Sequence, residues 1–187
     1  MSEPLPSAAR SSTSLQGTVH IRTVRDGDAV ALAAALTRHR DYLQPWEPLR
    51  PESFFTVEGQ RTVIADAKAA MAAGRGLFWV LCDGPRVVGR MSLTDMVRGA
   101  FQNGHLGYWI AQDHQGRGLA TAATGFACTA AAEWGLHRVQ AATLLHNVAS
   151  RTVLVRSGFT TIGTAENYLK INGSWQDHVL FQKILTP

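Results

Sequence analysis

The turn before residue 119 contains the residues with the clearest chemistry. The segment HLGYWIAQDHQGRGLATAA (105–123) predicts a strand that runs through a short turn into a helix. The free N–H groups and the dipole at a helix start bind anions, and glycine lets a ligand approach the backbone closely. Gly116 and Gly118, with the charge of Arg117 between them, therefore predict a diphosphate site. The residues alone leave a turn and helix cap without a ligand equally open.

Two nucleotide-binding motifs do not fit this turn. Thr121 stands where G-x-G-x-x-G requires its third glycine, and the G-x-x-x-x-G-K-[ST] pattern is not matched either. The spacing therefore argues against dinucleotide and P-loop sites.

A second segment, HNVASRTVLVRSGF (146–159), places polar residues at the start of another predicted helix. Asn147, Ser150 and Arg151 are positioned either to cap this helix or to face a ligand. Taken alone, Asn147 is best explained as an N-cap and Ser150 as an ordinary first-turn serine.

The elements around these segments alternate irregularly between strands and helices. Residues 1–17 are rich in Ser, Ala and Pro and predict a mobile tail. Residues 18–187 predict a single domain of mixed α/β (α+β) class, because strands both follow one another and alternate with helices. The expected strands are 19–24, 77–82, 87–94, 105–111, 139–144, 160–164 and 177–184, and the expected helices are 29–39, 55–73, 118–134 and 148–157.

Composition excludes several classes of protein. The chain has 187 residues, 45% hydrophobic and 17% charged, which is typical of a globular domain. The net charge is +4, and most of the surplus lies after His114, yet no run of Lys or Arg predicts nucleic-acid binding. No apolar stretch is long enough to span a membrane and no secretory signal is visible. Two isolated cysteines predict neither a metal site nor a disulfide and fit a cytoplasmic protein.

The turn resembles a coenzyme-A motif. Residues 115–120, Q-G-R-G-L-A, are similar to the Q/R-x-x-G-x-G/A motif of the GNAT acyltransferases. Within that family the chain resembles the RimJ-type ribosomal-protein-alanine N-acetyltransferases. The similar segments are LQPWEPLRPES (43–53), LGYWI (106–110), the Q-G-x-G-L turn, HRV (137–139), HN…S…R-x-GF (146–159) and YLKINGSWQDHVL (168–180).

The resemblance implies a GNAT fold of about seven strands and about four helices. Its mixed sheet would splay between the strand ending near Ile110 and the strand at 139–144, and acetyl-CoA would insert there. The turn would hold the diphosphate, and strand-end backbone groups would pair with the pantetheine and polarise the thioester carbonyl. The implied coenzyme-binding residues are Ile110, Ala111, Gln112, Gln115, Gly116, Arg117, Gly118, Leu119, Ala120, Thr121, Asn147, Ser150 and Arg151.

The implied reaction is direct attack of a primary amine on acetyl-CoA, with Ser150 protonating the leaving thiolate. Cys82 and Cys128 would then be structural. The implied acceptor is the N-terminal α-amine of a protein, such as a ribosomal protein. An α-amine has a pKa of about 7.7–8.0 and lysine about 10.4, so lysine needs on the order of 3.4 kcal/mol more for deprotonation.

The general base is not fixed by the resemblance. Many relatives carry acids at two positions that are Ala122 and His105 in this chain. His105 and Glu47 are the catalytic candidates retained, beside His146, Asp177 and water. Tyr108 is expected to pack in the core.

Several alternatives remain open at this stage. One alternative is a small-amine acceptor, such as an aminosugar, amino acid or antibiotic, and another is a different acyl-CoA donor. A non-catalytic acyl-CoA sensor is a further alternative. No direct nucleic-acid or membrane partner is expected, and exposed sheet edges make a homodimer plausible.

Overall fold

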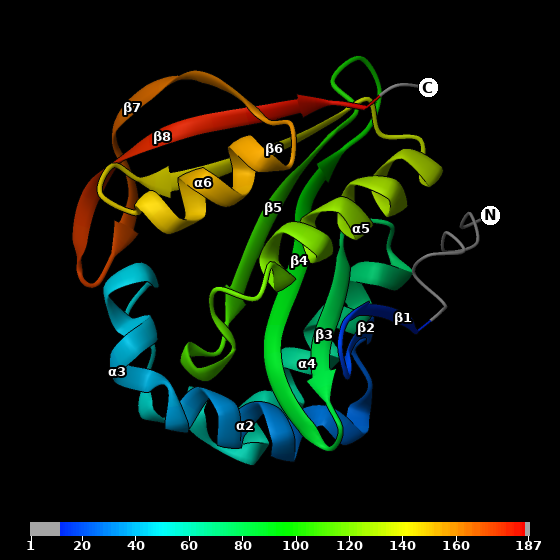
Figure 1. The fold of residues 1–187 in the computed structure, drawn as a ribbon, viewed down its shortest axis with the longest axis vertical. Helices are drawn as coiled ribbons and strands as arrows, with labels where there is room; N and C mark the ends of the chain where they lie inside the picture. The colour runs from blue at the N-terminus through cyan, green and yellow to red at the C-terminus, as the bar shows by residue number, and fades with distance from the viewer. Residues whose placement is uncertain (1–11, 186–187) are drawn as a thin grey trace.

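An eight-stranded sheet organises residues 12–185, the part of the chain that this computed structural model describes (Figure 1). The strand order is β1-β2-β3-β4-β5-β6-β8-β7, and every neighbouring pair is antiparallel except β5 and β6. The strands are β1 (Thr13–Gln16), β2 (Val19–Thr23), β3 (Leu77–Asp83), β4 (Arg86–Val97), β5 (Asn103–Ile110), β6 (Arg138–Leu144), β7 (Thr160–Ile171) and β8 (Ser174–Ile184).

Helices cover both faces of this sheet. The five are α2 (Ala29–Arg38), α3 (Arg40–Leu43), α4 (Val57–Ala72), α5 (Leu119–Glu133) and α6 (Val148–Arg156). α5 and α6 lie on one face, and α2 and α4 lie on the other (Figure 1). Within residues 12–185, none of the helices is long and apolar enough to cross a membrane.

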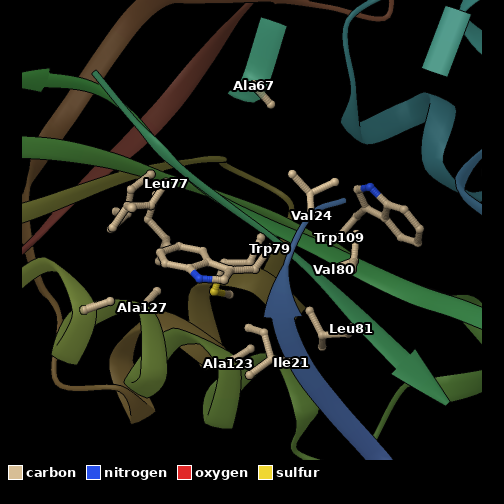
Figure 2. Packing of buried hydrophobic residues seen from close by; sticks show 14 of the residues in the cluster. Ile21, Val24, Ala67, Leu77, Trp79, Val80, Leu81, Trp109, Ala123 and Ala127 are labelled. Carbon is tan, nitrogen blue, oxygen red and sulfur yellow. The ribbon is translucent and has the colours of Figure 1, made fainter. Parts of the chain in front are cut away.

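The core has two layers because successive side chains of a strand point to opposite faces of the sheet. Trp79 of β3 packs on the side of Ala123 and Ala127 of α5 (Figure 2). Small residues on α5 let the helix approach the sheet closely. Val80 and Trp109 lie on the opposite face, toward α4 (Figure 2).

The predicted mixed α/β domain is confirmed, with eight strands and five helices instead of about seven and about four. The additional strand is β1, which pairs antiparallel with β2. The predicted boundary of the mobile tail at residue 17 is therefore wrong, because residues 13–16 are part of the sheet. Residues 1–11 lie outside the described part of the chain.

Two further boundaries differ for local reasons. The helix expected from residue 55 begins at Val57, because the hydroxyl of Thr56 accepts a hydrogen bond from Gly59 N–H (3.0 Å) and caps the helix. The two last strands are longer than expected and form one hairpin. Its turn, Asn172-Gly173, has positive φ at both residues (45° and 82°), and this dipeptide is a hairpin signal that the sequence analysis missed.

Candidate active site

The parallel strands β5 and β6 are paired only at their beginnings. Residues 103–105 pair with residues 138–140, and no pairing continues toward the C-terminal ends of the two strands (Figure 1). The splay predicted between these strands is confirmed. It opens toward the turn that follows β5.

The backbone of β5 offers unpaired groups to this opening. The N–H of Ala111 donates to the carbonyl of Val88 on β4 (2.8 Å). Because alternate residues of a strand direct their backbone groups to opposite sides, Ile110 and Tyr108 direct theirs toward the separated β6. These groups would be available to an extended pantetheine arm, the role expected for Ile110. Ala111 is also expected to bind the coenzyme through its backbone, but its N–H already donates to Val88 and is not free for a pantetheine.

The turn after β5 has the geometry of an anion site. Gly116 and Gly118 are left-handed, with φ of 69° and 72°, and a Cβ at Gly116 would meet no atom within 4 Å. α5 begins at Leu119 without a side-chain cap, and its first helical bond comes from Ala122 N–H. The N–H groups of residues 119–121 therefore lack intrahelical partners. The residues present fit a coenzyme-A diphosphate, which these N–H groups and Gly116 would hold.

A buried histidine links the turn to strand β3. His114, which is 2% exposed, lies between two carboxylates: its Nδ1 is 2.8 Å from Asp113 and its Nε2 is 3.2 Å from Asp83. Asp83 also accepts a hydrogen bond from Thr18 (2.6 Å). These hydrogen bonds, chiefly from Thr18 to Asp83 and from His114 to Asp113, lower the pKa of both carboxyls. The cluster ties the turn to β3, and nothing in the local sequence pattern identified it.

Other side chains fix the outer part of the turn. Arg117 donates to the carbonyl of Asp113 (3.1 Å), and the amide of Gln115 is hydrogen-bonded to Tyr42. Gln16 of β1 lies over the helix start, 3.0 Å from the point where a Cβ on Gly118 would stand. Within residues 12–185, no group of three or more His, Cys, Asp or Glu side chains is arranged to hold a metal ion.

Ser150 faces β5 across the opening. Its hydroxyl oxygen is 2.9 Å from the phenol oxygen of Tyr108, and either atom can be the donor. Burial raises the pKa of Tyr108 to about 12, so the phenol stays protonated at neutral pH. Tyr108 packs against the hydrophobic core, as the sequence analysis expected, and its phenol also contacts the hydroxyl of the serine predicted to be catalytic.

Asn147 and Arg151 shape the start of α6. The side-chain oxygen of Asn147 accepts from the N–H of Ser150 (3.0 Å), which makes Asn147 the N-cap of α6. Its amide nitrogen has no hydrogen bond within the described residues and can still donate to a pantetheine. Arg151 donates to the carbonyl of Leu145 (3.1 Å).

Segments that are distant in sequence meet beside the start of α6. The carbonyl of Glu47 accepts from Asn172 N–H (2.9 Å), so the loop after α3 touches the tip of the β7–β8 hairpin. The ring of Trp46 lies 5.4 Å from the ring of His146, beside the start of α6. The Glu47 carboxylate has no hydrogen bond or ion pair among residues 12–185, and its charge acts on the guanidinium of Arg90.

The three predicted catalytic residues are not joined by contacts. His105 lies at the closed end of the splay and shares the sheet face of Trp109, whereas Tyr108 and Ser150 meet on the other face. No hydrogen bond links Ser150, His105 or Glu47 to one another within the described chain. Asp177, another candidate base, accepts from the N–H of Asn167 (2.9 Å).

Neither cysteine has the environment of a nucleophile. Cys82 and Cys128 are buried, and burial raises the pKa of both thiols. This agrees with the structural role expected for them.

The sequence profile of the acetyltransferase (GNAT) domain matches residues 18–160. The chain therefore belongs to the GNAT acetyltransferase family. It is an acyltransferase, and acetyl-CoA is its co-substrate.

Relatives within this family are similar over most of the chain. The [ribosomal protein uS5]-alanine N-acetyltransferase of Escherichia coli (strain K12) is 35% identical over 167 residues, which cover 86% of this chain and 84% of that protein. The structure is similar to that of ribosomal-protein-S5-alanine acetyltransferase from Vibrio fischeri, with a TM-score of 0.88, 32% identity, and coverage of 95% of this chain and 100% of that one. It is also similar to Mycobacterium smegmatis RimJ in complex with CoA-disulfide, with a TM-score of 0.86, 29% identity, and coverage of 92% and 85%.

Proposed function

We propose that this enzyme acetylates the N-terminal α-amine of a protein, and that a ribosomal protein is its natural acceptor. The contact between residues 43–53 and 168–180 carries the proposal. These segments resemble ribosomal-protein N-acetyltransferases in sequence, lie far apart along the chain, and meet through Glu47 and Asn172 beside the splay. A 35% identical relative bears the name of an alanine N-acetyltransferase for ribosomal protein uS5.

In the proposed mechanism, acetyl-CoA supplies an acetyl thioester. The turn at 116–121 holds the diphosphate, and the backbone of Ile110 orients the pantetheine. The neutral amine attacks the thioester carbon, so that a C–N bond forms as the C–S bond breaks. Ser150, oriented by Tyr108 and by the Asn147 cap, donates its proton to the leaving sulfur, directly or through water, and takes a proton back from water. The proton lost by the amine passes to water or to one of the two candidate bases, His105 and Glu47.

The acid–base environment supports an α-amine over a lysine. Ala122 and His105 occupy the positions at which many relatives carry an acid. An α-amine near pKa 8 is partly neutral at physiological pH, whereas a lysine near 10.4 needs on the order of 3.4 kcal/mol more to lose its proton. A site with few carboxylates therefore favours N-termini.

Thiol release from acetyl-CoA with three peptides tests the proposal. One peptide begins with a free alanine, the second is the same peptide with a blocked N-terminus, and the third is N-blocked with an internal lysine. Turnover is expected only with the first. Turnover with the lysine peptide would contradict the proposal.

The same assay identifies the alternatives. Absence of turnover with every peptide, despite acetyl-CoA binding by calorimetry, would favour a small-amine acceptor, another acyl-CoA or a sensor. A panel of aminosugars and amino acids would then separate these cases. The proposed acceptor places the enzyme in the cytoplasm, and gel filtration would determine whether it acts as a homodimer.

A further inference from the structure

Arg90, on the sheet face of Val80 and Trp109, is a cation without a hydrogen-bond or ion-pair partner among residues 12–185. It lies at the middle of β4, directly opposite Val80 of β3 and Trp109 of β5. Directly opposed residues share a face, so the half-buried Arg90 side chain stands between two buried apolar side chains. Within residues 12–185, its guanidinium makes no hydrogen bond and no ion pair.

Two other arginines of this sheet, Arg22 and Arg138, are also partly buried, and Arg22 has a carboxylate partner. Arg22 forms a bidentate ion pair with Asp28, with N–O distances of 2.7 and 2.8 Å. Such pairing is the usual requirement for a guanidinium removed from water, because an unpaired charge loses its hydration without compensation. Burial lowers the pKa of Arg90, which is consistent with this missing compensation.

Two charged residues act on Arg90, and they do not neutralise the region. Glu47 favours its charge and Arg50 opposes it. The Arg50 guanidinium lies 4.8 Å from the ring centre of Phe54 and has no carboxylate partner in the described part of the chain. Two arginines with one carboxylate leave a positive surplus, and most of the guanidinium N–H donors are free.

The position of Arg90 places this positive charge next to the strand end proposed to hold the thioester. The pair Arg90–Trp109 is followed along the strands by the pair Gly89–Ile110, and Ile110 begins the strand end proposed to hold the thioester. Adjacent residues of a strand are about 3.3 Å apart, so the backbone of Arg90 is one residue from the level of Ile110, and we expect a group bound by Arg90 to lie within the first residues of the acceptor.

We propose that Arg90 and Arg50 form a carboxylate-binding subsite of the acceptor site. The preferred acceptor then carries an acidic side chain within its first three residues. This inference rests on the proposed function and specifies the substrate class. Bidentate hydrogen bonds from a guanidinium to a carboxylate are strong and directional, and they would supply the partner that Arg90 lacks.

Paired peptides test the subsite. Each begins with alanine and carries either Glu or its neutral isostere Gln at position 2 or 3. We expect about a tenfold higher kcat/KM for the Glu peptide, and Arg90→Met should reduce this preference to about twofold or less. Arg90→Lys should retain part of it. Arg61→Met is the control, because Arg61 is exposed on α4 and pairs with Glu58 at 2.9 Å.

Calorimetry with enzyme and coenzyme A gives a readout that does not depend on turnover. The Glu peptide should bind more tightly than the Gln peptide, and Arg90→Met should abolish the difference without lowering the melting temperature. Equal affinities of the two peptides for the parent enzyme would overturn the subsite. An equal loss of affinity for both peptides in Arg90→Met would overturn it as well. A preference for free alanine over alaninamide would support the subsite and show that it binds the α-carboxylate of a small acceptor. Acetylation of both peptides without discrimination would leave the proposed function intact and reject the subsite.

Discussion

The phenol oxygen of Tyr108 and the hydroxyl oxygen of Ser150 lie 2.9 Å apart across the opened part of the sheet. One comes from the strand whose backbone faces the opening, and the other from the first turn of α6. A serine hydroxyl that accepts a hydrogen bond from the phenol is left to direct its own proton elsewhere. The leaving sulfur is the proposed recipient.

A double-mutant cycle tests this relationship. Ser150→Ala should lower kcat by about a hundredfold, the scale of a lost acid catalyst, while the acetyl-CoA Kd changes little. Tyr108→Phe should lower kcat less, and the double variant should be no slower than Ser150→Ala, because Tyr108 acts through the serine. Steady-state kinetics and calorimetry measure both quantities. Fully additive losses would show that Tyr108 acts independently.

Asn147 has two functions that substitutions can separate. Its side-chain oxygen caps α6, and its amide nitrogen is proposed to contact the pantetheine. Asn147→Ala should lower the free energy of unfolding by about 1 kcal/mol. Asn147→Asp keeps the oxygen and removes the donor, so the melting temperature should persist while acetyl-CoA binding weakens. Unchanged binding by the Asp variant would limit Asn147 to the cap.

Gly118 combines a backbone requirement with a lack of space. A valine there would adopt φ of 72°, a conformation that disfavours β-branched residues, and its Cβ would approach Gln16 at 3.0 Å. Gly118→Val should weaken acetyl-CoA binding by at least tenfold. Gly125→Ala is the control, since Gly125 lies within the helix that follows Gly118, with no atom within 4 Å of a new Cβ. That control should bind normally and gain up to about 1 kcal/mol of stability. Normal binding by Gly118→Val would refute the diphosphate position.

Acid should destabilise the protein in two steps. Burial lowers the pKa of His39 below its ordinary 6.5, so the unfolded chain binds the proton more tightly and stability falls as pH drops below about 6.5. The pKa values of Asp83 and Asp113 lie below their ordinary 3.8, so their stabilisation is full above that value and is lost as pH falls through the folded values. Urea denaturation across pH should show both steps. His39→Gln should remove only the first; an unchanged slope near pH 6 would exclude His39 as its source.

Local signals predicted much of this molecule. The helix expected at 118–134 is observed as α5 at Leu119–Glu133, because Gly118 and Gly135 stand at the two ends of an Ala-rich run. The glycine turn and the polar start of α6 were likewise found from residue type and spacing. The pairing of Tyr108 with Ser150 and the burial of His114 were missed, because each depends on contacts between distant segments. β1 was missed because four residues between Ser-rich and Gly-containing stretches carry almost no periodic pattern.

Because successive side chains of β5 point to opposite faces of the sheet, this strand separates two sets of residues inside the enzyme. Tyr108 projects toward the face that α5 and α6 cover, whereas His105 and Trp109 project toward the opposite face, which α2 and α4 cover. If the proposed acceptor and donor sites lie on these two faces, changes at odd-numbered positions of this strand should alter acceptor choice while even-numbered positions preserve use of the donor. Insertion of a single residue near position 104 would exchange the two sets. A lineage of such enzymes can thus diversify its targets by substitution along β5, but hardly by changes in its length.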